Sequence, residues 1–201
     1  MITQADIPEC VQLVAREHDC ETRVFRARVL ADMVEDAGRP EDAGLIRCRL
    51  EAGDDPRDVI VWYVRSLLRE CTERTSGGPY TEFENGLCWS VSCCGLAVRT
   101  LEPLRHMPYV RHLDVSKTAI KDDALACLDD MIGLESFVAD STRIGDRTIE
   151  RLSRLPRLAV VSIDNTRVTS ASVETLARMN LRLLNWPLYH LDLLRPDIRP
   201  I

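Results

Sequence analysis

Three thiols lie within seven residues of the chain, in the stretch Cys88-Trp89-Ser90-Val91-Ser92-Cys93-Cys94. Thiolates placed close together can bind zinc, exchange disulfides or attack a substrate as nucleophiles. His106 and His112 follow this stretch and, with Cys88 and Cys93, supply the four ligand types of a zinc site. The first question is therefore whether this stretch is a reactive or a metal-binding site.

A second candidate chemistry is acyl transfer. Ser90, His112 and Asp114 supply the residue types of a nucleophile, a general base and an orienting acid. Such residues act together only if the fold brings them into hydrogen-bonding distance, so both hypotheses depend on the elements that carry them.

Length and composition describe an ordinary folded protein. The chain has 201 residues, of which 45% are hydrophobic and 29% charged, which argues against wholesale disorder. Its formal net charge is −6, and its only lysines are Lys117 and Lys121. No basic block or basic helix face is present, so we do not expect a nucleic acid partner.

The N-terminal residues and the longest apolar run bear on location. The sequence MITQADIPEC carries acids where a signal peptide has a basic start and an apolar core. The longest apolar run, residues 59–64, is much shorter than the roughly 20 residues that span a bilayer. We therefore expect a cytoplasmic protein without a membrane partner, whose eight cysteines are mostly thiols.

Amphipathic patterns predict four helices before residue 75. They cover residues 7–14 behind Asp6 as an N-cap candidate, 22–36, 41–51, and a segment that starts at Asp55-Pro56. Phe25, Val29 and Met33, with Leu30 and Val34 beside them, mark the apolar side predicted for the second helix.

Within this helical part, residues 28–53 resemble a short bacterial companion domain that recurs beside repeat arrays, particularly in planctomycete proteins. The matching residues are Ala31-Asp32, Glu35, Gly38 and Leu45-Ile46-Arg47, whereas Met33 stands where that domain usually has Trp. The resemblance implies an architecture and no chemistry, and the charged residues read as a solvated helix face.

The rest of the chain repeats with a period of 24 residues. The segments Thr118-Ala119-Ile120, Thr142-Arg143-Ile144 and Thr166-Arg167-Val168 are separated by this interval. Apolar columns keep the same register, for example Leu113 with Phe137 and Val161. One further step back pairs Trp89 with Leu113 and Val91 with Val115, which predicts about four repeats from about residue 86 to residue 181.

The repeated unit reads Leu-x-x-Leu-x-Val-x-x-Thr-x-Ile before a helical pattern, most clearly in VRHLDVSKTAI at residues 110–120. This resembles the leucine-rich repeat, specifically the short bacterial type written LxxLxLxxTxITDxGLxxLxxL. Asp122 and Asp146 match the Asp of that pattern, and they are expected to cap the helix on the convex side, as is Ser170.

Such a unit has one short strand and one helix and cannot bury both apolar faces alone, so stacking must supply the missing walls. We therefore predict an α/β protein. A helical N-terminal domain, residues 1–80, precedes a short leucine-rich repeat solenoid with a parallel concave sheet, residues 81–201. Register is lost near Pro187, so the end is read as a degenerate strand and cap in which Trp186 covers the last core layer.

The 24-residue register argues against both candidate chemistries. It directs Cys88 to the concave face, Cys93 to a strand end and Cys94 to the interior, so the thiols diverge and neither a metal nor a cofactor is expected. His112 and Asp114 share one strand and one face, and no Gly-rich elbow accompanies Ser90. Only Cys88 keeps some claim to reactivity.

The function that remains is protein binding without catalysis. The concave face would contact the partner through eight residues: His112, Asp114, Ser116, Ser136, Val138, Asp140, Ser162 and Asp164. The two acids at 140 and 164 suit a basic patch on the partner. Two alternatives stay open: a structural or self-associating subunit of a larger assembly, and an enzyme that uses the Cys88 thiol near the domain junction.

Overall fold

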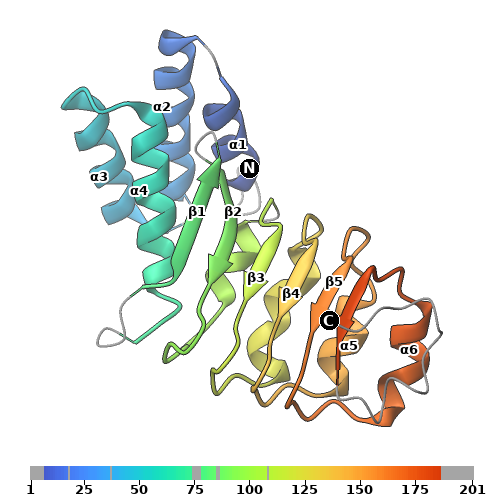
Figure 1. Ribbon diagram of the computed structural model, residues 1–201. Helices are drawn as coiled ribbons and strands as arrows, with labels where there is room; N and C mark the ends of the chain where they lie inside the picture. The colour runs from blue at the N-terminus through green and yellow to red at the C-terminus, as the bar shows by residue number, and fades with distance from the viewer. Residues whose placement is uncertain are drawn as a thin grey trace. The chain divides into compact units, whose positions relative to one another are not determined.

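The computed structural model describes residues 7–17, 19–36, 38–73, 78–84, 87–107 and 109–186. The chain forms two compact units (Figure 1). The helical unit comprises Met1–Leu67 with Glu82–Cys88, and the repeat unit comprises Leu68–Thr81 with Trp89–Ile201. The predicted division has one boundary, at residue 80, whereas here Leu68–Thr81 groups with the repeat unit and Glu82–Cys88 with the helical unit.

Four helices form most of the helical unit: α1 Ile7–Arg16, α2 Cys20–Asp36, α3 Pro40–Glu51 and α4 Pro56–Arg69. They match the four predicted helices to within about two residues at each described start, while Asp6 lies outside the described residues. Helix α1 packs against α2, and α2 against α3. Proline in the first turn of α3 and α4 suits these helix starts, because the missing N–H has no partner there.

The apolar side predicted for α2 is partly wrong. The predicted Leu30, Met33 and Val34 are buried, but Phe25 is 66% exposed. The buried stripe of α2 also includes Ala27 and Ala31, and it does not include its largest apolar residue. Leu45 of α3 is likewise exposed, and Ala43 is buried instead.

The residues that suggested the companion domain meet in an ion-pair cluster between α2 and α3. The Arg47 guanidinium lies 2.6 Å from an Asp32 carboxylate oxygen and 2.5 Å from a Glu35 carboxylate oxygen. All three side chains are at least a third exposed, so the cluster adds little to stability.

In the repeat unit, short strands alternate with short helical segments. The strands of the chain are β1 Tyr80–Glu84, β2 Leu87–Ser92, β3 His112–Asp114, β4 Ser136–Val138, β5 Val160–Ser162 and β6 Leu183–Asn185, and they form one sheet in chain order. The helical segments are η2 Glu102–His106, η3 Asp122–Asp130, α5 Asp146–Leu152, η4 Ser170–Ser172 and α6 Val173–Arg178. Figure 1 shows α5 and α6 on one side of the parallel strands.

Parallel pairing from β2 to β6 confirms that the predicted units stack strand on strand. The helical side is less regular than expected. The first two units carry the 3-10 helices η2 and η3, and only the third and fourth have α-helical turns, in α5 and α6.

The register of the first repeat differs from the predicted one by two residues. Val91 pairs with Leu113, and Trp89 does not, so the first strand is offset by 22 residues and not 24. On the helical side, Leu101 and Leu104 are fully buried and keep the 24-residue interval to Leu125 and Leu128. The first repeat is therefore two residues shorter between its strand and its helical segment.

The left-handed turn that follows each strand supports this register. Gly95, Lys117, Ser141 and Asn165 all have positive φ, at 70°, 57°, 57° and 53°. The amides of Gly95, Lys117 and Ser141 each donate to the next repeat, to the carbonyl of the residue just before its turn residue. An example is the 2.9 Å bond from Gly95 N to Ser116 O. Gly95 is the residue best suited to this conformation, and it occupies the place predicted for Cys93.

The repeat threonines close the same turn. The Oγ1 hydroxyls of Thr118 and Thr142 each donate at 2.7 Å to the carbonyl three residues earlier, on Val115 and Ala139. Both threonines are 6% exposed, so the hydroxyl satisfies a carbonyl that water does not reach. The first repeat has Leu96 at this position, where the amide donates to Cys93 O instead.

Asp122 and Asp146 do not cap the helices of their own repeats. The Asp122 carboxylate accepts from Gly145 N at 2.7 Å and from Thr148 Oγ1 at 2.5 Å, both in the following repeat. Asp146 accepts in the same way from Thr169 and Ser172. The repeat aspartate therefore joins consecutive repeats. The cap of η4 is Thr169, one residue before the predicted Ser170.

This bonding gives a pH-dependent prediction for Asp146. Partial burial alone raises the pKa of the Asp146 carboxyl, but hydrogen bonds from Ser172 and Thr169 outweigh it and hold the pKa below its usual range. A carboxyl with a lowered folded pKa stabilises the fold fully above its unfolded pKa, and the contribution is lost as pH falls through the folded value. We expect Asp146→Asn to unfold at lower urea concentration than wild type at pH 7, with the gap shrinking below about pH 4.

Asp123→Asn is the control for this measurement, because Asp123 is highly exposed and pairs only with Arg147 at the surface. A gap between wild type and Asp146→Asn that stays constant from neutral pH to pH 3 would contradict the assignment.

The last described strand, β6, pairs with β5 at a 23-residue offset. Trp186 follows β6 and is 2% exposed, in line with its predicted place over the last core layer. Pro187 and the rest of the predicted cap lie outside the described residues. None of the described helices is both long and apolar enough to cross a bilayer.

Candidate functional site

The open face of the sheet is the face turned away from the helical segments. We define it by alternate side chains of β2 to β5: Ser90, Ser92, His112, Asp114, Ser136, Val138, Val160 and Ser162. Their partners Val91, Leu113, Phe137 and Val161 point the other way and are at most 1% exposed. The predicted division of the strand residues between two faces is therefore confirmed from β3 to β5.

A hollow of about 380 Å³ lies on the open face at β2 to β4. It is lined by Trp89, Ser90, Val91, His112, Leu113, Asp114, Ser136 and Val138. The Trp89 and His112 rings meet edge to face, with centroids 5.1 Å apart and planes at 84°. Trp89 was expected in the core column of Leu113, but it forms a wall of this hollow.

Hydrogen bonds hold two carboxylates in place, those of Asp114, which lines the hollow, and of Asp140, which follows β4. Asp114 accepts from Ser92 Oγ at 3.1 Å and from Ser116 N at 2.9 Å. Asp140 accepts from Ser162 Oγ at 2.7 Å and from Asp164 N at 2.8 Å. Each carboxylate is therefore hydrogen-bonded to a residue of a neighbouring repeat, Asp114 to the preceding one and Asp140 to the following one.

No cation neutralises these acids within the described part of the chain. No ion pair is recorded for Asp114, Asp140 or Asp164, whereas acids on the helical side, such as Asp129, pair with arginines. Asp114 on the open face, and Asp140 and Asp164 just beyond the ends of β4 and β5, therefore form a row of negative charges in consecutive repeats.

The eight predicted contact residues differ in accessibility. His112, Asp114, Ser136, Val138 and Asp140 are half-buried, and Asp164 is exposed. Ser116 and Ser162 are only 6% and 4% exposed. Ser162 donates to Asp140 and accepts from Asn185 Nδ2 at 2.9 Å, so it acts as a support for the acid.

The residues of the proposed acyl-transfer triad do not form its hydrogen bonds. Ser90 lies directly opposite His112 in the sheet, but the recorded donors to the Asp114 carboxylate are Ser92 and Ser116. The His112 ring packs against Trp89. His112, the base of such a triad, therefore contacts the Trp89 ring and not the Asp114 carboxylate.

Cys88 and Cys94 lie on the sides opposite to those predicted, and Cys93 is shifted from its predicted place at the strand end. Cys88, expected on the concave face, is fully buried; Cys93 is buried in the column of Val115; Cys94, expected in the interior, is exposed. Burial raises the pKa of Cys93 to about 12, so this thiol is uncharged at neutral pH. Among the described residues, no group of His, Cys, Asp and Glu is arranged to hold a metal ion.

Thiol labelling tests these positions. We expect a mildly electrophilic reagent at pH 7.5 to label Cys20, Cys48 and Cys94 in the folded protein, because these three are exposed. Cys88 and Cys93 should react only after urea is added, since their side chains have no accessible surface. Peptide mapping by mass spectrometry gives the order, with Cys94→Ser as the control. Labelling of Cys88 before Cys94 would contradict the assigned register.

One pair of charged residues at equivalent repeat positions was not predicted as part of a site. Arg143 and Arg167 occupy the same place in consecutive repeats, where the preceding repeat has Ala119. Both arginines are exposed, and they line a second hollow together with the repeat threonines. The 24-residue alignment already contained this signal, since both arginines lie within the aligned Thr-x-Ile segments.

Comparisons with known proteins add little. No family profile matches the chain, and no curated protein matches it. Among solved structures, the chain is similar to internalin C2 from Listeria monocytogenes, with 24% identity and a TM-score of 0.39. The match covers 45% of this chain and 38% of that one, so it spans well under two thirds of the internalin.

Proposed function

We propose that the repeat unit is a leucine-rich repeat solenoid that binds another protein without catalysing a reaction, and that the partner contributes an extended basic segment. The observation that carries the proposal is a row of acids in three consecutive repeats, Asp114, Asp140 and Asp164, which have no ion pair among the described residues. Hydrogen bonds hold the first two carboxylates, and the third is exposed. A polar surface of this kind attracts and orients an oppositely charged partner.

Preorganisation supports a binding role. Hydrogen bonds from Ser92 and Ser162 already hold the Asp114 and Asp140 carboxylates, so little side-chain entropy is lost when a partner binds. The sheet is a second rigid support, because its strands are fixed by the buried column of Leu113, Phe137 and Val161.

The hollow beside the acids defines the kind of segment that fits. Trp89 and Val138 offer apolar contact area, and Asp114 lies in the same lining. A segment in which an aliphatic or aromatic side chain neighbours lysine or arginine would fill the hollow and pair with the acids. Trp is among the side chains that contribute most at protein interfaces.

The two alternatives have less support. Self-association through the open face would bring equal rows of acids together in a chain of net charge −6, which is unfavourable. An enzyme that uses Cys88 would need an accessible thiol, and this one is fully buried. A cytoplasmic location stays a prediction.

The test is a titration of the full chain with a fluorescent peptide that alternates lysine with leucine. We expect saturable binding that weakens as salt rises and falls about tenfold or more in the double variant Asp140→Lys/Asp164→Lys, because two attractive contacts become repulsive. The matched control is Asp123→Lys/Glu150→Lys, which makes the same change of charge at exposed positions on the helical side. Equal losses in the two double variants would mean that net charge alone governs binding and would contradict the proposal.

A further inference from the structure

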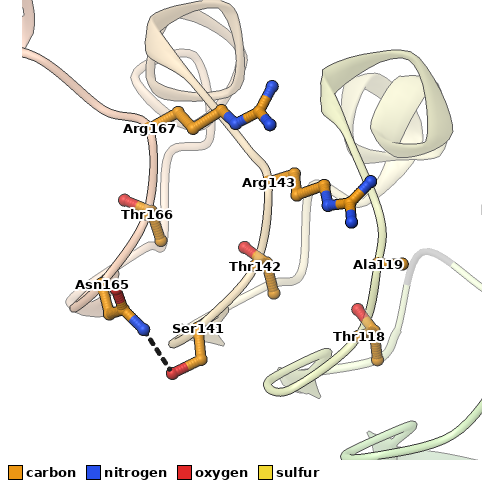
Figure 2. Close-up of a pocket in the computed structure, with 8 residues that line it drawn as sticks. All are labelled: Thr118, Ala119, Ser141, Thr142, Arg143, Asn165, Thr166 and Arg167. Atoms are coloured by element: carbon orange, nitrogen blue, oxygen red, sulfur yellow. Dashed lines mark hydrogen bonds between the residues drawn. The ribbon is translucent and has the colours of Figure 1, made fainter.

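The loops that follow β3, β4 and β5 form a second hollow of about 440 Å³ (Figure 2). We call this surface the loop edge. It is lined by Thr118, Ala119, Ser141, Thr142, Arg143, Asn165, Thr166 and Arg167. No acidic residue is among them. The lining is therefore neutral apart from two guanidinium groups, and its net charge is positive.

Arg143 and Arg167 stand in register, and Figure 2 shows their side chains extending in the same direction. Their backbones are fixed, because Arg143 N donates to Ile120 O at 3.0 Å and Arg167 N donates to Ile144 O at 2.9 Å. Neighbouring strands of a sheet lie about 4.8 Å apart, so the repeat places the backbones of these two arginines on adjacent loops.

Elsewhere in the repeat unit, an arginine forms an ion pair with an acid of the preceding repeat. Arg147, on the helical side, pairs at 3.0 Å with Asp123 one repeat earlier. The residue one repeat before Arg167 is Arg143, a like charge, and neither has a recorded ion pair in the described part of the chain. Like charges on adjacent loops repel each other, and a bound anion would relieve this repulsion.

The nearest acids before these arginines in the chain, Asp140 and Asp164, precede the left-handed turns, and neither forms an ion pair with Arg143 or Arg167. Asp140 precedes Arg143 in the chain, and its carboxylate accepts from Ser162 and from the Asp164 amide. Asp164 itself is exposed. The left-handed turns at Ser141 and Asn165 separate these acids from the arginines that follow.

Hydroxyl and amide donors complete the loop edge. The hydroxyls of Thr118 and Thr142 already donate to backbone carbonyls, so towards a ligand they can only accept hydrogen bonds. Ser141 Oγ accepts from Asn165 Nδ2 at 3.2 Å, which leaves its own proton and the second Asn165 N–H free to donate. The donors are two guanidinium forks flanked by one hydroxyl and one amide.

We propose that the loop edge binds a phosphate monoester carried by a phosphorylated protein segment. A phosphate dianion matches the charge of two guanidinium groups, and its oxygens accept the parallel hydrogen bonds that arginine forks donate. Nucleic acid is the disfavoured source, because the lining has no aromatic side chain for a base to stack on and the chain carries a net charge of −6. This site is separate from the open face and does not depend on it.

The test observes the arginine side chains directly. In the full chain, the Nε–Hε resonances of Arg143 and Arg167 should shift saturably on addition of inorganic phosphate and, at lower concentration, of a peptide with one phosphoserine among neutral residues. Arg143→Gln/Arg167→Gln should weaken phosphopeptide binding by about tenfold or more, since each hydrogen bond to a charged group contributes substantially.

The matched control is Arg154→Gln/Arg157→Gln, which removes the same charge at two other exposed positions of the repeat unit. Three outcomes would overturn the proposal: equal weakening in both double variants, equal affinity for the same peptide with glutamate in place of phosphoserine, or tighter binding of oligothymidylate at the same two arginines. Circular dichroism of both double variants, with unchanged spectra, separates loss of binding from loss of fold.

Discussion

Phe137→Ala should be among the most destabilising single substitutions in the repeat unit, lowering the free energy of unfolding by about 3–5 kcal/mol. Phe137 is fully buried at the middle of the inward column, between Leu113 on one side and Val161 on the other. Removing the ring leaves a cavity that neighbouring repeats cannot fill without breaking the strand register. Urea unfolding followed by circular dichroism measures the loss.

Val138→Ala is the matched control, because Val138 is the next residue of the same strand but is half-buried on the open face. We expect a loss below about 1 kcal/mol for this variant. Equal losses at the two positions would contradict the assignment of faces to β4.

Asp122→Ala should produce the second large effect, a loss of about 2–4 kcal/mol, although its side chain is only half-buried. The substitution removes the acceptor for Gly145 N and for the hydroxyl of Thr148, and Thr148 is fully buried. A buried donor left without an acceptor costs more than the loss of an exposed contact. The measurement is again urea unfolding.

The control is the adjacent Asp123→Ala. Asp123 is 88% exposed and contacts only the exposed Arg147, so its loss should change stability by less than about 0.5 kcal/mol. Asp122→Asn should lie between wild type and Asp122→Ala, because the amide oxygen still accepts. A larger effect at Asp123 than at Asp122 would show that the repeats are not joined through this carboxylate.

Much of the repeat architecture was predictable, because stacking imposes a period on the sequence. From β3 to β5, the columns of His112, Asp114 and Leu113 follow the 24-residue alignment residue by residue. The four helices before residue 75 were predictable as well, since proline and glycine mark their ends. The burial of α2 was harder to predict, because its pattern indicated Leu30 and Val34 correctly but also Phe25, which is exposed, and not Ala27, which is buried.

The first repeat shows why the remainder could not be predicted. A shift of two residues keeps the alternation of inward and outward side chains, so the apolar pattern of β2 fits the 22-residue and the 24-residue register equally. The turn residue was the stronger signal, since Gly95 suits the left-handed conformation that Lys117, Ser141 and Asn165 also adopt. The bonds from Asp122 and Asp146 to the following repeat depend on side-chain geometry that no spacing reveals.

The central claim is that a basic segment of another protein lies on the open face. Methyl NMR of the full chain with a spin-labelled lysine–leucine peptide tests it most directly, because a spin label broadens only nearby methyl resonances. We expect the resonances of Val138 and Val160 to broaden while those of Ile132, Ile149 and Leu152 do not. Broadening of Ile132 with sharp signals from Val138 and Val160 would place the peptide elsewhere and contradict the claim.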